Sequence, residues 1–278
     1  MNVGLVAGRG PLPGLVAEGA RASGHALSTV QLEGYGSASR FGNPVATFPL
    51  GSFGGYTKWL REHGVTHVCM AGLVERPDFG ELRPDLKGLK VLPGLIKAAR
   101  DGDDALLQAL IRAFRTEGFE IIAPQDLASS LLAPSGQFGA IRSAPKGRAR
   151  ADVIKACEVA REIGRLDIGQ ACVVCDGLVL AVEAQEGTAA MLRRVANLPD
   201  AVRGTPLSRR GVLAKMLKPG QDARVDLPTI GPETVELCSE AGIKGLVVEA
   251  GRAFVLDREA TVARADAAGI FLLGLPPV

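Results

Sequence analysis

The first half of the chain alternates short apolar runs with segments of helical periodicity. The short runs predict strands and the longer periodic segments predict helices, because a half-buried helix repeats its apolar positions every three to four residues. This alternation is typical of a parallel sheet covered by helices. The predicted strands are Val3–Ala7, Leu27–Leu32, His67–Ala71 and Glu120–Ala123, and the predicted helices are Leu12–Ala22, Thr57–His63 and residues 105–118.

Two features of the first half precede the helix predicted at residues 105–118, namely a long loop and a pair of aspartates. Residues 74–94 read VERPDFGELRPDLKGLKVLPG, and their proline, glycine and charge predict an irregular loop. A loop that long after a strand is more often functional than accidental. Asp103 is predicted to cap the following helix, and the carboxylates of Asp103 and Asp104 suit the positive end of its dipole.

The second half shows a different order of elements. The stretch 132–150 is rich in Pro, Gly, Ser and basic residues, and the boundary between two domains is placed near its start. A helix is predicted at Ala151–Ile163, followed by a β-hairpin in which Asp176-Gly177 joins the runs 172–175 and 178–182, and then by a helix at Thr188–Val195. The predicted fold class is α/β with two domains, a Rossmann-like parallel sheet in residues 1–132 and a mixed α/β domain in residues 133–278.

The end of the chain repeats the order of the hairpin. Residues 245–257, GLVVEAGRAFVLD, read as a strand, a turn around glycine and a strand, and residues 258–269 read as a helix. Superposing Gly177 on Gly251 brings Glu183 onto Asp257. An internal duplication is therefore a hypothesis for the second half.

The stretch 215–231, KMLKPGQDARVDLPTIG, has no apolar period that would bury it as a helix or strand. A solvated connection is one interpretation, because most charge-rich loops only stay wet. The other is a site for phosphoryl chemistry, since Lys215, Lys218 and Arg224 suit phosphate and Asp226 suits a hard metal ion. Asp222 is assigned to solvent.

Composition narrows the classes of partner. The chain has 32 basic and 30 acidic residues for a net charge of +2, so no nucleic acid is expected as a partner. The hydrophobic content is 47% with a mean hydropathy of +0.18, yet no run approaches the roughly 18 apolar residues of a membrane-spanning helix. The amino terminus has no basic leader and Arg9 interrupts its apolar run, so a cytoplasmic location is expected.

Cysteine and histidine offer no chemistry at recognisable spacing. The five cysteines are scattered and odd in number, which favours reduced thiols. Cys172 and Cys175 form a C-x-x-C on a predicted strand, where residues three apart point to opposite faces, so core packing is favoured over a metal or disulfide. The three histidines suggest neither zinc nor a catalytic triad.

A glycine turn follows the first predicted strand. Gly8, Gly10 and Gly14 do not match the dinucleotide fingerprint, which needs its last glycine one place earlier. A strand, a glycine turn and a helix start still form a general seat for an anion or nucleotide, and a plain tight connection is the alternative. Gln31 stands at the end of the second strand, where nicotinamide enzymes place an acidic residue, so that enzyme class is disfavoured.

Six long motifs resemble the UDP-2,3-diacylglucosamine pyrophosphatases of the LpxI type. The resemblance covers the full length of the chain, and such long motifs rarely match by chance. It implies a magnesium-dependent hydrolysis that yields UMP and 2,3-diacylglucosamine 1-phosphate (lipid X) in lipid A biosynthesis, with the lipid held between two α/β domains. The motifs are GLVAGRGPLP, AGLVERPDF, GLKVLPGLIKAARDGDDALL, EGFEI, REIGRLDIGQACVVCDGLVLAVEAQEGTAAMLRRV and KPGQDARVDLPTIG.

The resemblance assigns roles to particular residues. Asp226, in the R-x-D-L-P motif, is implied to be essential and to bind Mg²⁺. Lys215 and Arg224 are implied to act with it in catalysis, facing the pyrophosphate together with Lys218 and Gln221. The further substrate contacts that the resemblance implies are Gly8, Arg9, Gly10, Leu12, Gly72, Asp103, Asp104, Gln170 and Thr229.

The chain departs from the family pattern at two places. Arg9 stands where the family commonly has a middle glycine, and Ala189 stands where it commonly has the aspartate of E-G-T-D. The expected partners are a lipid-linked nucleotide sugar and the inner-membrane surface, to which the enzyme would be peripheral. The oligomeric state stays open, with a homodimer as one option. A non-catalytic lipid or nucleotide-sugar binding protein and a nucleotide-sugar oxidoreductase remain as alternatives.

Overall fold

The computed structural model describes residues 1–36, 41–42, 44–75, 77–141, 145–224 and 226–277. The chain forms two compact units. Unit 1 comprises Met1–Ser130 together with Asp222–Asp226, and unit 2 comprises Leu131–Gln221 and Leu227–Val278. The sequence placed one boundary between residues 132 and 133, and it gave no sign that a short segment of the charged stretch returns to the first unit.

Unit 1 is built on a five-stranded sheet in the order β3-β2-β1-β4-β5, and all of its strands are parallel. The order reverses between β1 and β4, as in Rossmann-like folds. This confirms the fold class predicted for the first half. The elements are β1 Asn2–Ala7, α1 Leu12–Ala22, β2 Ala26–Leu32, β3 Val45–Phe48, α2 Phe53–Glu62, β4 His67–Ala71, α3 Leu86–Asp101, α4 Asp103–Thr116, β5 Glu120–Ile121 and α5 Pro124–Leu127.

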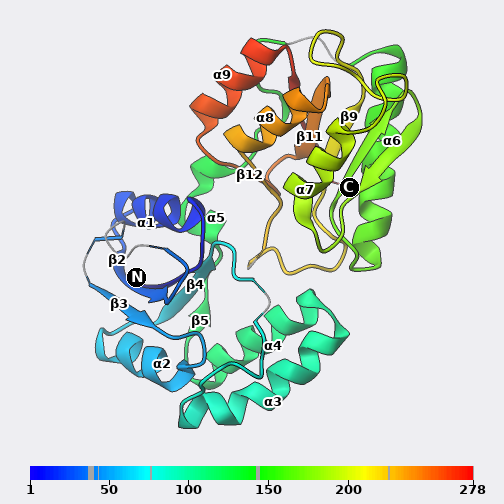
Figure 1. Ribbon diagram of the computed structural model, residues 1–278. Helices are drawn as coiled ribbons and strands as arrows, with labels where there is room; N and C mark the ends of the chain where they lie inside the picture. The colour runs from blue at the N-terminus through cyan, green and yellow to red at the C-terminus, as the bar shows by residue number, and fades with distance from the viewer. Residues whose placement is uncertain (37–40, 43, 76, 142–144, 225, 278) are drawn as a thin grey trace. The chain divides into compact units, whose positions relative to one another are not determined.

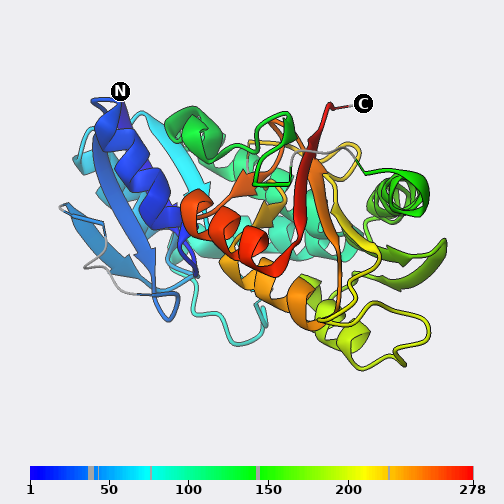
Figure 2. The same ribbon diagram turned by 90° about the horizontal axis from the view of Figure 1, so that it is seen from above.

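Helices cover both faces of this sheet (Figures 1 and 2). Helices α1 and α5 pack together on one face, and α2 and α4 pack on the other. The second face holds the aromatic core, in which Phe53 and Tyr56 of α2 contact Phe114 of α4. Helix α3 forms an outer layer that packs against α2 and α4.

The stretch 74–94 is not irregular throughout, which corrects the prediction from its composition. Helix α3 begins at Leu86 and continues through Pro93 to Asp101. Asp85 caps it, because its carboxylate accepts a hydrogen bond from the Gly88 amide at 2.7 Å. Pro93 is exposed, so water can reach the carbonyl that its missing N–H leaves without a helical partner.

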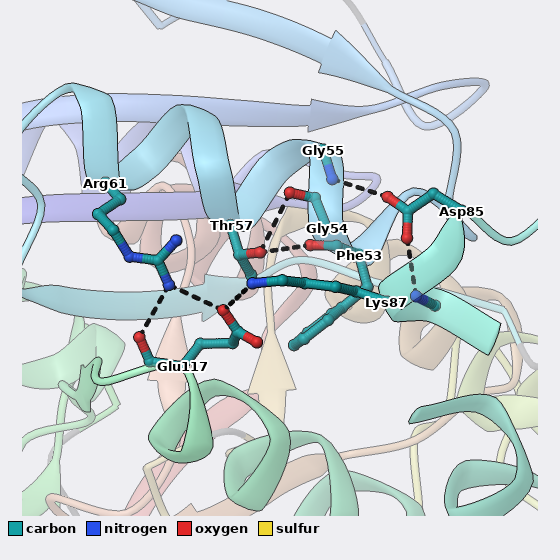
Figure 3. Close-up of polar contacts among 9 residues, drawn as sticks. Phe53, Gly54, Gly55, Thr57, Arg61, Asp85, Lys87 and Glu117 are labelled. Atoms are coloured by element: carbon teal, nitrogen blue, oxygen red, sulfur yellow. Dashed lines mark hydrogen bonds and ion pairs between the residues drawn. The ribbon is translucent and has the colours of Figure 1, made fainter. Parts of the chain in front are cut away.

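Polar contacts tie α3 to its neighbours (Figure 3). The second carboxylate oxygen of Asp85 accepts from the Gly55 amide of α2 at 2.7 Å. Glu117 directly follows the end of α4. Its carboxylate contacts Lys87 of α3 at 2.5 Å and Arg61 of α2 at 2.8 Å. Helix α3 is therefore held by contacts between residues far apart in the sequence.

We expect Asp85→Ala to lower the free energy of unfolding by about 1–2 kcal/mol at neutral pH, since it removes a cap and the bridge to α2. Burial alone would raise the pKa of Asp85, but the hydrogen bonds from the amides of Gly88 and Gly55 outweigh it and lower the pKa. The carboxylate therefore stabilises the fold at high pH. This stabilisation is lost as the pH falls from about 4 through the lowered pKa of the folded state.

Urea unfolding of the wild type and Asp85→Ala, repeated from neutral to acidic pH, measures both effects. The difference between the two proteins is expected to shrink with falling pH. Asp101→Ala, at the other end of α3, is the matched control and should change stability by less than about 0.5 kcal/mol. A difference that is absent at neutral pH, or that grows in acid, would contradict the role of Asp85.

The capping assignment at α4 is also corrected. Gly102, with φ of 126°, occupies the capping position, while Asp103 and Asp104 are the first two residues of the helix. The glycine supplies a conformation that other residues rarely adopt. Both carboxylates still lie in the first turn, where the helix dipole favours negative charge.

Unit 2 is built on a six-stranded mixed sheet in the order β6-β13-β11-β9-β7-β8. The three strands β13, β11 and β9 are parallel, and β7 runs antiparallel to β9. This confirms the mixed α/β class. The elements are β6 Gly136–Gln137, α6 Gly147–Arg165, β7 Ala171–Cys175, β8 Leu178–Val182, α7 Gly187–Ala196, β9 Val212–Lys215, β10 Thr229–Ile230, α8 Pro232–Glu240, β11 Gly245–Glu249, β12 Phe254–Val255, α9 Arg258–Ala268 and β13 Phe271–Leu275.

Helix α6 packs on one face of the six-stranded sheet, and α7, α8 and α9 form the layer on the other (Figure 1). Val173 and Leu213 point into the core on the side of α7 and α8, while Cys172 and Val212 point toward α6. All five cysteines are free and buried, which confirms the core interpretation of the C-x-x-C. In the described part of the chain, no helix is both long and apolar enough to span a bilayer.

One hairpin prediction is confirmed and the other is wrong. Strands β7 and β8 pair antiparallel around Asp176-Gly177. The runs at residues 245–249 and 254–255 do not pair with each other, because β11 lies between β9 and β13 while β12 pairs in parallel with β10. This removes the structural basis for an internal duplication. Asp257 instead caps α9 by accepting a hydrogen bond from the Ala260 amide.

Candidate functional site

The carboxyl edge of the unit 1 sheet carries the glycine turn after β1 and the turn after β4. These two strands are neighbours at the point where the strand order reverses, and ligands of open parallel sheets bind outside this point. The Gly8 amide donates to the Ala71 carbonyl at 2.9 Å, and Arg9 and Leu73 exchange backbone hydrogen bonds of 2.8 and 3.0 Å. The two turns therefore form one backbone platform.

Glycine is required where these turns touch. A Cβ atom on Gly8 would lie 2.7 Å from the Leu73 carbonyl oxygen. Gly72 has φ of +91°, and a Cβ atom on it would lie 2.7 Å from Pro13 Cγ and 2.8 Å from the Arg9 carbonyl oxygen. Gly10 has φ of +95° but open space around it. Leu12 is the first residue of α1 and follows this platform.

We expect Gly72→Ala to destabilise the protein by about 2–4 kcal/mol, because it adds a backbone clash to a strained conformation. Gly10→Ala is the matched comparison and should cost about 1 kcal/mol, since only its left-handed conformation resists a side chain. Urea unfolding of both variants measures the difference. If the two substitutions lower the free energy of unfolding equally, the close contact of Gly72 with Pro13 and Arg9 does not contribute to stability.

The Arg9 side chain has partners within unit 1. Its guanidinium forms an ion pair with Glu75 at 2.8 Å and lies over the Tyr35 ring, 5.5 Å from the ring centre. The side chain is 52% exposed, so the pair remains open to solvent and to ions. Arg9 is thus an exposed cation in the turn after β1, held by its ion pair with Glu75.

Asp222 and Arg224 form an ion pair in unit 1, which corrects the assignment of Asp222 to solvent. The Asp222 side chain is only 13% exposed and accepts hydrogen bonds from the Arg224 guanidinium at 2.5 and 2.8 Å. Gln108 of α4 donates a third at 3.0 Å. The Arg224 guanidinium is the main cause of a strongly lowered pKa of Asp222, with Gln108 contributing. Val225 lies outside the described residues.

This segment adjoins the carboxyl edge of the unit 1 sheet. The Gln125 amide group donates to the Ala223 carbonyl at 2.7 Å, and Gln125 belongs to α5, which begins just after the carboxyl end of β5. Gln108 lies one helical turn beyond Asp104, so the first turn of α4 faces the same region. The structure thereby holds half-buried Asp226 in a segment fixed to this edge by Gln108 and Gln125.

The lysines of the charged stretch belong to unit 2. Lys215 is the last residue of β9 and not part of a loop; its side chain is buried and donates to the Thr229 carbonyl of β10 at 3.2 Å. Lys218 forms an ion pair with Asp167 at 2.7 Å, and its side chain is only 10% exposed. Both cations are held against the carboxyl end of the parallel strands of this unit.

Gln170 lies beside the start of this segment, because its carbonyl accepts from the Met216 amide at 2.9 Å. The backbone amide of Gln170 donates to Glu183, whose carboxylate also accepts from the Thr188 hydroxyl at 2.5 Å. The Glu183 carboxylate is therefore occupied by these two hydrogen bonds, which position residues 170 and 188, and it is not an open metal ligand. Gln221 is buried, and its backbone amide donates to the Lys218 carbonyl at 3.1 Å.

The structure groups the predicted residues in two sets, each within one unit. Gln108 and Gln125 also contact these sets and were missed, because each acts through a partner about 100 residues away and no local motif marks it. Asp167, one of the carboxylates that the sequence offers in a glycine-rich context, is the ion-pair partner of Lys218. Unit 1 holds Gly8, Arg9, Gly10, Leu12, Gly72, Asp103, Asp104, Arg224 and Asp226, and unit 2 holds Gln170, Lys215, Lys218, Gln221 and Thr229.

The donor set limits what kind of metal could bind. The described residues contain no group of three or more His, Cys, Asp or Glu side chains able to hold a metal ion. This donor set does not suit zinc, but Mg²⁺ usually takes one or two carboxylates and fills its remaining positions with water and phosphate oxygens. Asp226 can supply one such carboxylate, and Asp222 is held by Arg224 and Gln108.

Comparisons with known proteins cover nearly the whole chain. A family model described as the LpxI N-terminal domain matches residues 2–131, and one described as the LpxI C-terminal domain matches residues 135–273. The UDP-2,3-diacylglucosamine pyrophosphatase LpxI of Caulobacter vibrioides is 52% identical over 276 residues, which cover 99% of this chain and 98% of that protein.

Two solved structures show only distant likeness. The precorrin-6A reductase CobK has a TM-score of 0.32 at 15% identity, covering 100% of this chain and 90% of that one. The UDP-glucose 4-epimerase of Thermus thermophilus in complex with NAD has a TM-score of 0.30 at 14% identity, covering 100% and 87%. At such low scores neither supports a conclusion about this chain.

Proposed function

The chain belongs to the LpxI family, and on that premise we propose that it hydrolyses the pyrophosphate bond of UDP-2,3-diacylglucosamine. The products would be UMP and 2,3-diacylglucosamine 1-phosphate, a step in lipid A biosynthesis. The observation that carries the proposal is the nearly full-length similarity to the Caulobacter pyrophosphatase. The placement of Asp226, Lys215 and Lys218 supports it.

The residues of this chain suit the charge problem of the reaction. A pyrophosphate diester carries two negative charges, so attack by water needs cations that neutralise the charge growing on the phosphate oxygens. The proposal assigns this work to Lys215, Lys218 and Arg224. The partners of Lys218 and Arg224 hold these cations in fixed positions, which lowers the cost of ordering them around the substrate.

The proposed cofactor is Mg²⁺, with Asp226 as its protein ligand. When bound, the ion would polarise a phosphate oxygen and stabilise negative charge at the reacting phosphorus. The half-buried position of Asp226 near the carboxyl edge of the unit 1 sheet supports this role. The turn after β1 leads into the N-terminus of α1 at the same edge, and we propose that it contacts the nucleotide part of the substrate.

The same proposal fixes the expected location of the protein. Its lipid-linked substrate lies in a membrane, so the enzyme would act from the cytoplasm as a peripheral protein at the inner-membrane surface. The high apolar content of the chain agrees with a site that accommodates two acyl chains.

Incubation of purified protein with UDP-2,3-diacylglucosamine in detergent micelles tests the function. With Mg²⁺ we expect UMP and diacylglucosamine 1-phosphate, and with a chelator we expect neither until Mg²⁺ is restored. Lipid that stays bound and uncleaved in Mg²⁺ would support a binding protein instead. Product formation that is equally fast in chelator would overturn the magnesium assignment while leaving the hydrolysis intact.

A further inference from the structure

The outer face of helix α3 exposes apolar side chains that a folded surface usually covers. Leu86 is 81% exposed and Leu89 is 55% exposed. With Pro93 and Ile96 they recur at intervals of three and four residues, so they lie along one side of the helix. The opposite side packs against α2 and α4, as the buried Gly88 and Ala99 show. Helix α3 is therefore amphipathic with its apolar stripe turned outward.

This stripe is hollowed in its second half. Leu89, Leu92, Pro93 and Ile96 line a shallow hollow of about 370 Å³ together with the basic residues Lys97 and Arg100. The surface thus combines apolar side chains with cations within one helix of 16 residues.

The charges on this face are mainly positive. Lys90, Lys97 and Arg100 are exposed, and none of the three has an ion-pair partner within the described part of the chain. Lys87 differs, because it turns inward to Glu117 (Figure 3). The only acidic residue of α3 is Asp101 at its last position. A partner of this face must therefore offer apolar material flanked by negative charge.

We propose that the outer face of α3 docks onto an anionic lipid bilayer. Amphipathic helices with Leu on one face and Lys or Arg beside it lie in the interfacial plane, with the apolar side chains entering the acyl boundary. The long stems of Lys90, Lys97 and Arg100 allow their charges to reach lipid phosphates while the stems stay in apolar surroundings. The inference rests on the proposed function, because a lipid-linked substrate is what requires the protein to approach a bilayer.

A second copy of the chain fits this face less well. In a two-fold dimer the same surface meets itself, so Lys90, Lys97 and Arg100 of both copies would be brought together. Like charges at a contact oppose association. An anionic bilayer supplies both the negative charge and the apolar layer that this face lacks.

The test is sedimentation of the full chain with vesicles. Vesicles that contain phosphatidylglycerol should bind the wild type, and vesicles of phosphatidylcholine alone should bind it at least about tenfold more weakly. The double variant Leu86→Gln/Leu89→Gln should lose about tenfold or more in affinity for the anionic vesicles. The Lys97→Gln/Arg100→Gln variant should bind the anionic vesicles about fivefold more weakly for each cation removed, and this loss of affinity should shrink at high salt.

Matched controls remove the same residue types elsewhere. Leu207 is fully exposed in unit 2, so Leu207→Gln should leave vesicle binding unchanged. Lys58 and Arg252 are exposed cations outside α3. The Lys58→Gln/Arg252→Gln variant should therefore lose much less affinity for the anionic vesicles than the Lys97→Gln/Arg100→Gln variant. Thermal unfolding and analytical ultracentrifugation of every variant check the fold and the mass of the particle.

Pyrophosphatase activity in detergent micelles separates this inference from the proposed function. The Leu86→Gln/Leu89→Gln variant should keep the wild-type kcat and KM there, because no bilayer is involved. A raised KM would place the substrate's acyl chains on this face instead, and an altered particle mass would indicate contact between copies. Each of these two results would overturn the proposal. Unchanged vesicle binding by the double leucine variant, or a wild type that does not bind anionic vesicles, would also overturn it. A wild type that binds vesicles but cleaves nothing in detergent contradicts only the proposed function.

Discussion

The Asp226→Asn variant is expected to release UMP at least about 10³-fold more slowly than the wild type in saturating Mg²⁺. The substitution keeps the size of the side chain but removes its negative charge, so the proposed metal ligand is lost while the loop keeps its shape. Metal stabilisation of charge at a phosphoryl group is worth several kcal/mol, which corresponds to a loss of about this size. The measurement is the steady-state rate of UMP release across a range of Mg²⁺ concentrations.

Two controls separate chemistry from folding in this experiment. Asp200→Asn changes an exposed aspartate, 67% exposed and paired with Arg203, and should leave the rate unchanged. Asp226→Asn should bind substrate and unfold at nearly the wild-type temperature, since Asp226 is only half-buried. A rate of UMP release within about tenfold of the wild-type rate would contradict the assignment of Asp226 as a metal ligand.

The Lys215→Met variant is expected to lose about 10²–10³-fold in kcat/KM. Lys215 is buried at the end of β9, and its ammonium group is held by the Thr229 carbonyl. A cation fixed in a partly dry site stabilises growing negative charge more strongly than a solvated one, and removing one such donor commonly costs this much. Methionine keeps the length and apolar stem of the side chain, so the loss should reflect charge.

Lys244→Met is the matched control for Lys215. Lys244 is exposed and directly precedes β11, so its removal should change kcat/KM by less than about twofold. Kinetics of both variants, measured with the same micellar substrate, give the comparison. Equal activity of Lys215→Met and Lys244→Met would show that the buried lysine serves only the packing of β9.

The sequence predicted the regular elements well where a local pattern determined them. The strand His67–Ala71 and the helix Leu12–Ala22 match the structure at both ends, and Asp176-Gly177 forms the predicted hairpin. In these places the apolar period and the turn chemistry agree with the final packing. Nothing distant was needed to decide the conformation.

The prediction was wrong where distant residues decided the conformation. Helix α3 forms in spite of Pro93, and Lys87 ties it to Glu117, 30 residues away. Its cap, Asp85, is a local signal that was overlooked. Residues 254–255 left the expected hairpin because β10 offers them a parallel partner. Asp222 was assigned to solvent although one of its partners, Arg224, lies two residues away; the other, Gln108, lies 114 residues away.

The candidate site was predictable only in part for a related reason. Lys215, Lys218, Arg224 and Asp226 stood out because cations and a carboxylate share one short stretch. Their supporting partners lie on other elements and carry no motif. The return of residues 222–226 to unit 1 likewise involves Gln108, an ordinary residue of a predicted helix, and Gln125, in a helix that was not predicted.

Phosphorus NMR of the reaction gives the most direct test of the central claim. UDP-2,3-diacylglucosamine is incubated in micelles with the wild type and Mg²⁺, with Asp226→Asn as the parallel sample. We predict that the two coupled pyrophosphate resonances disappear while two phosphomonoester resonances grow in equal amounts, and that the Asp226→Asn sample stays unchanged over the same time. Persistence of the pyrophosphate resonances with the folded wild-type protein in Mg²⁺ would contradict the account.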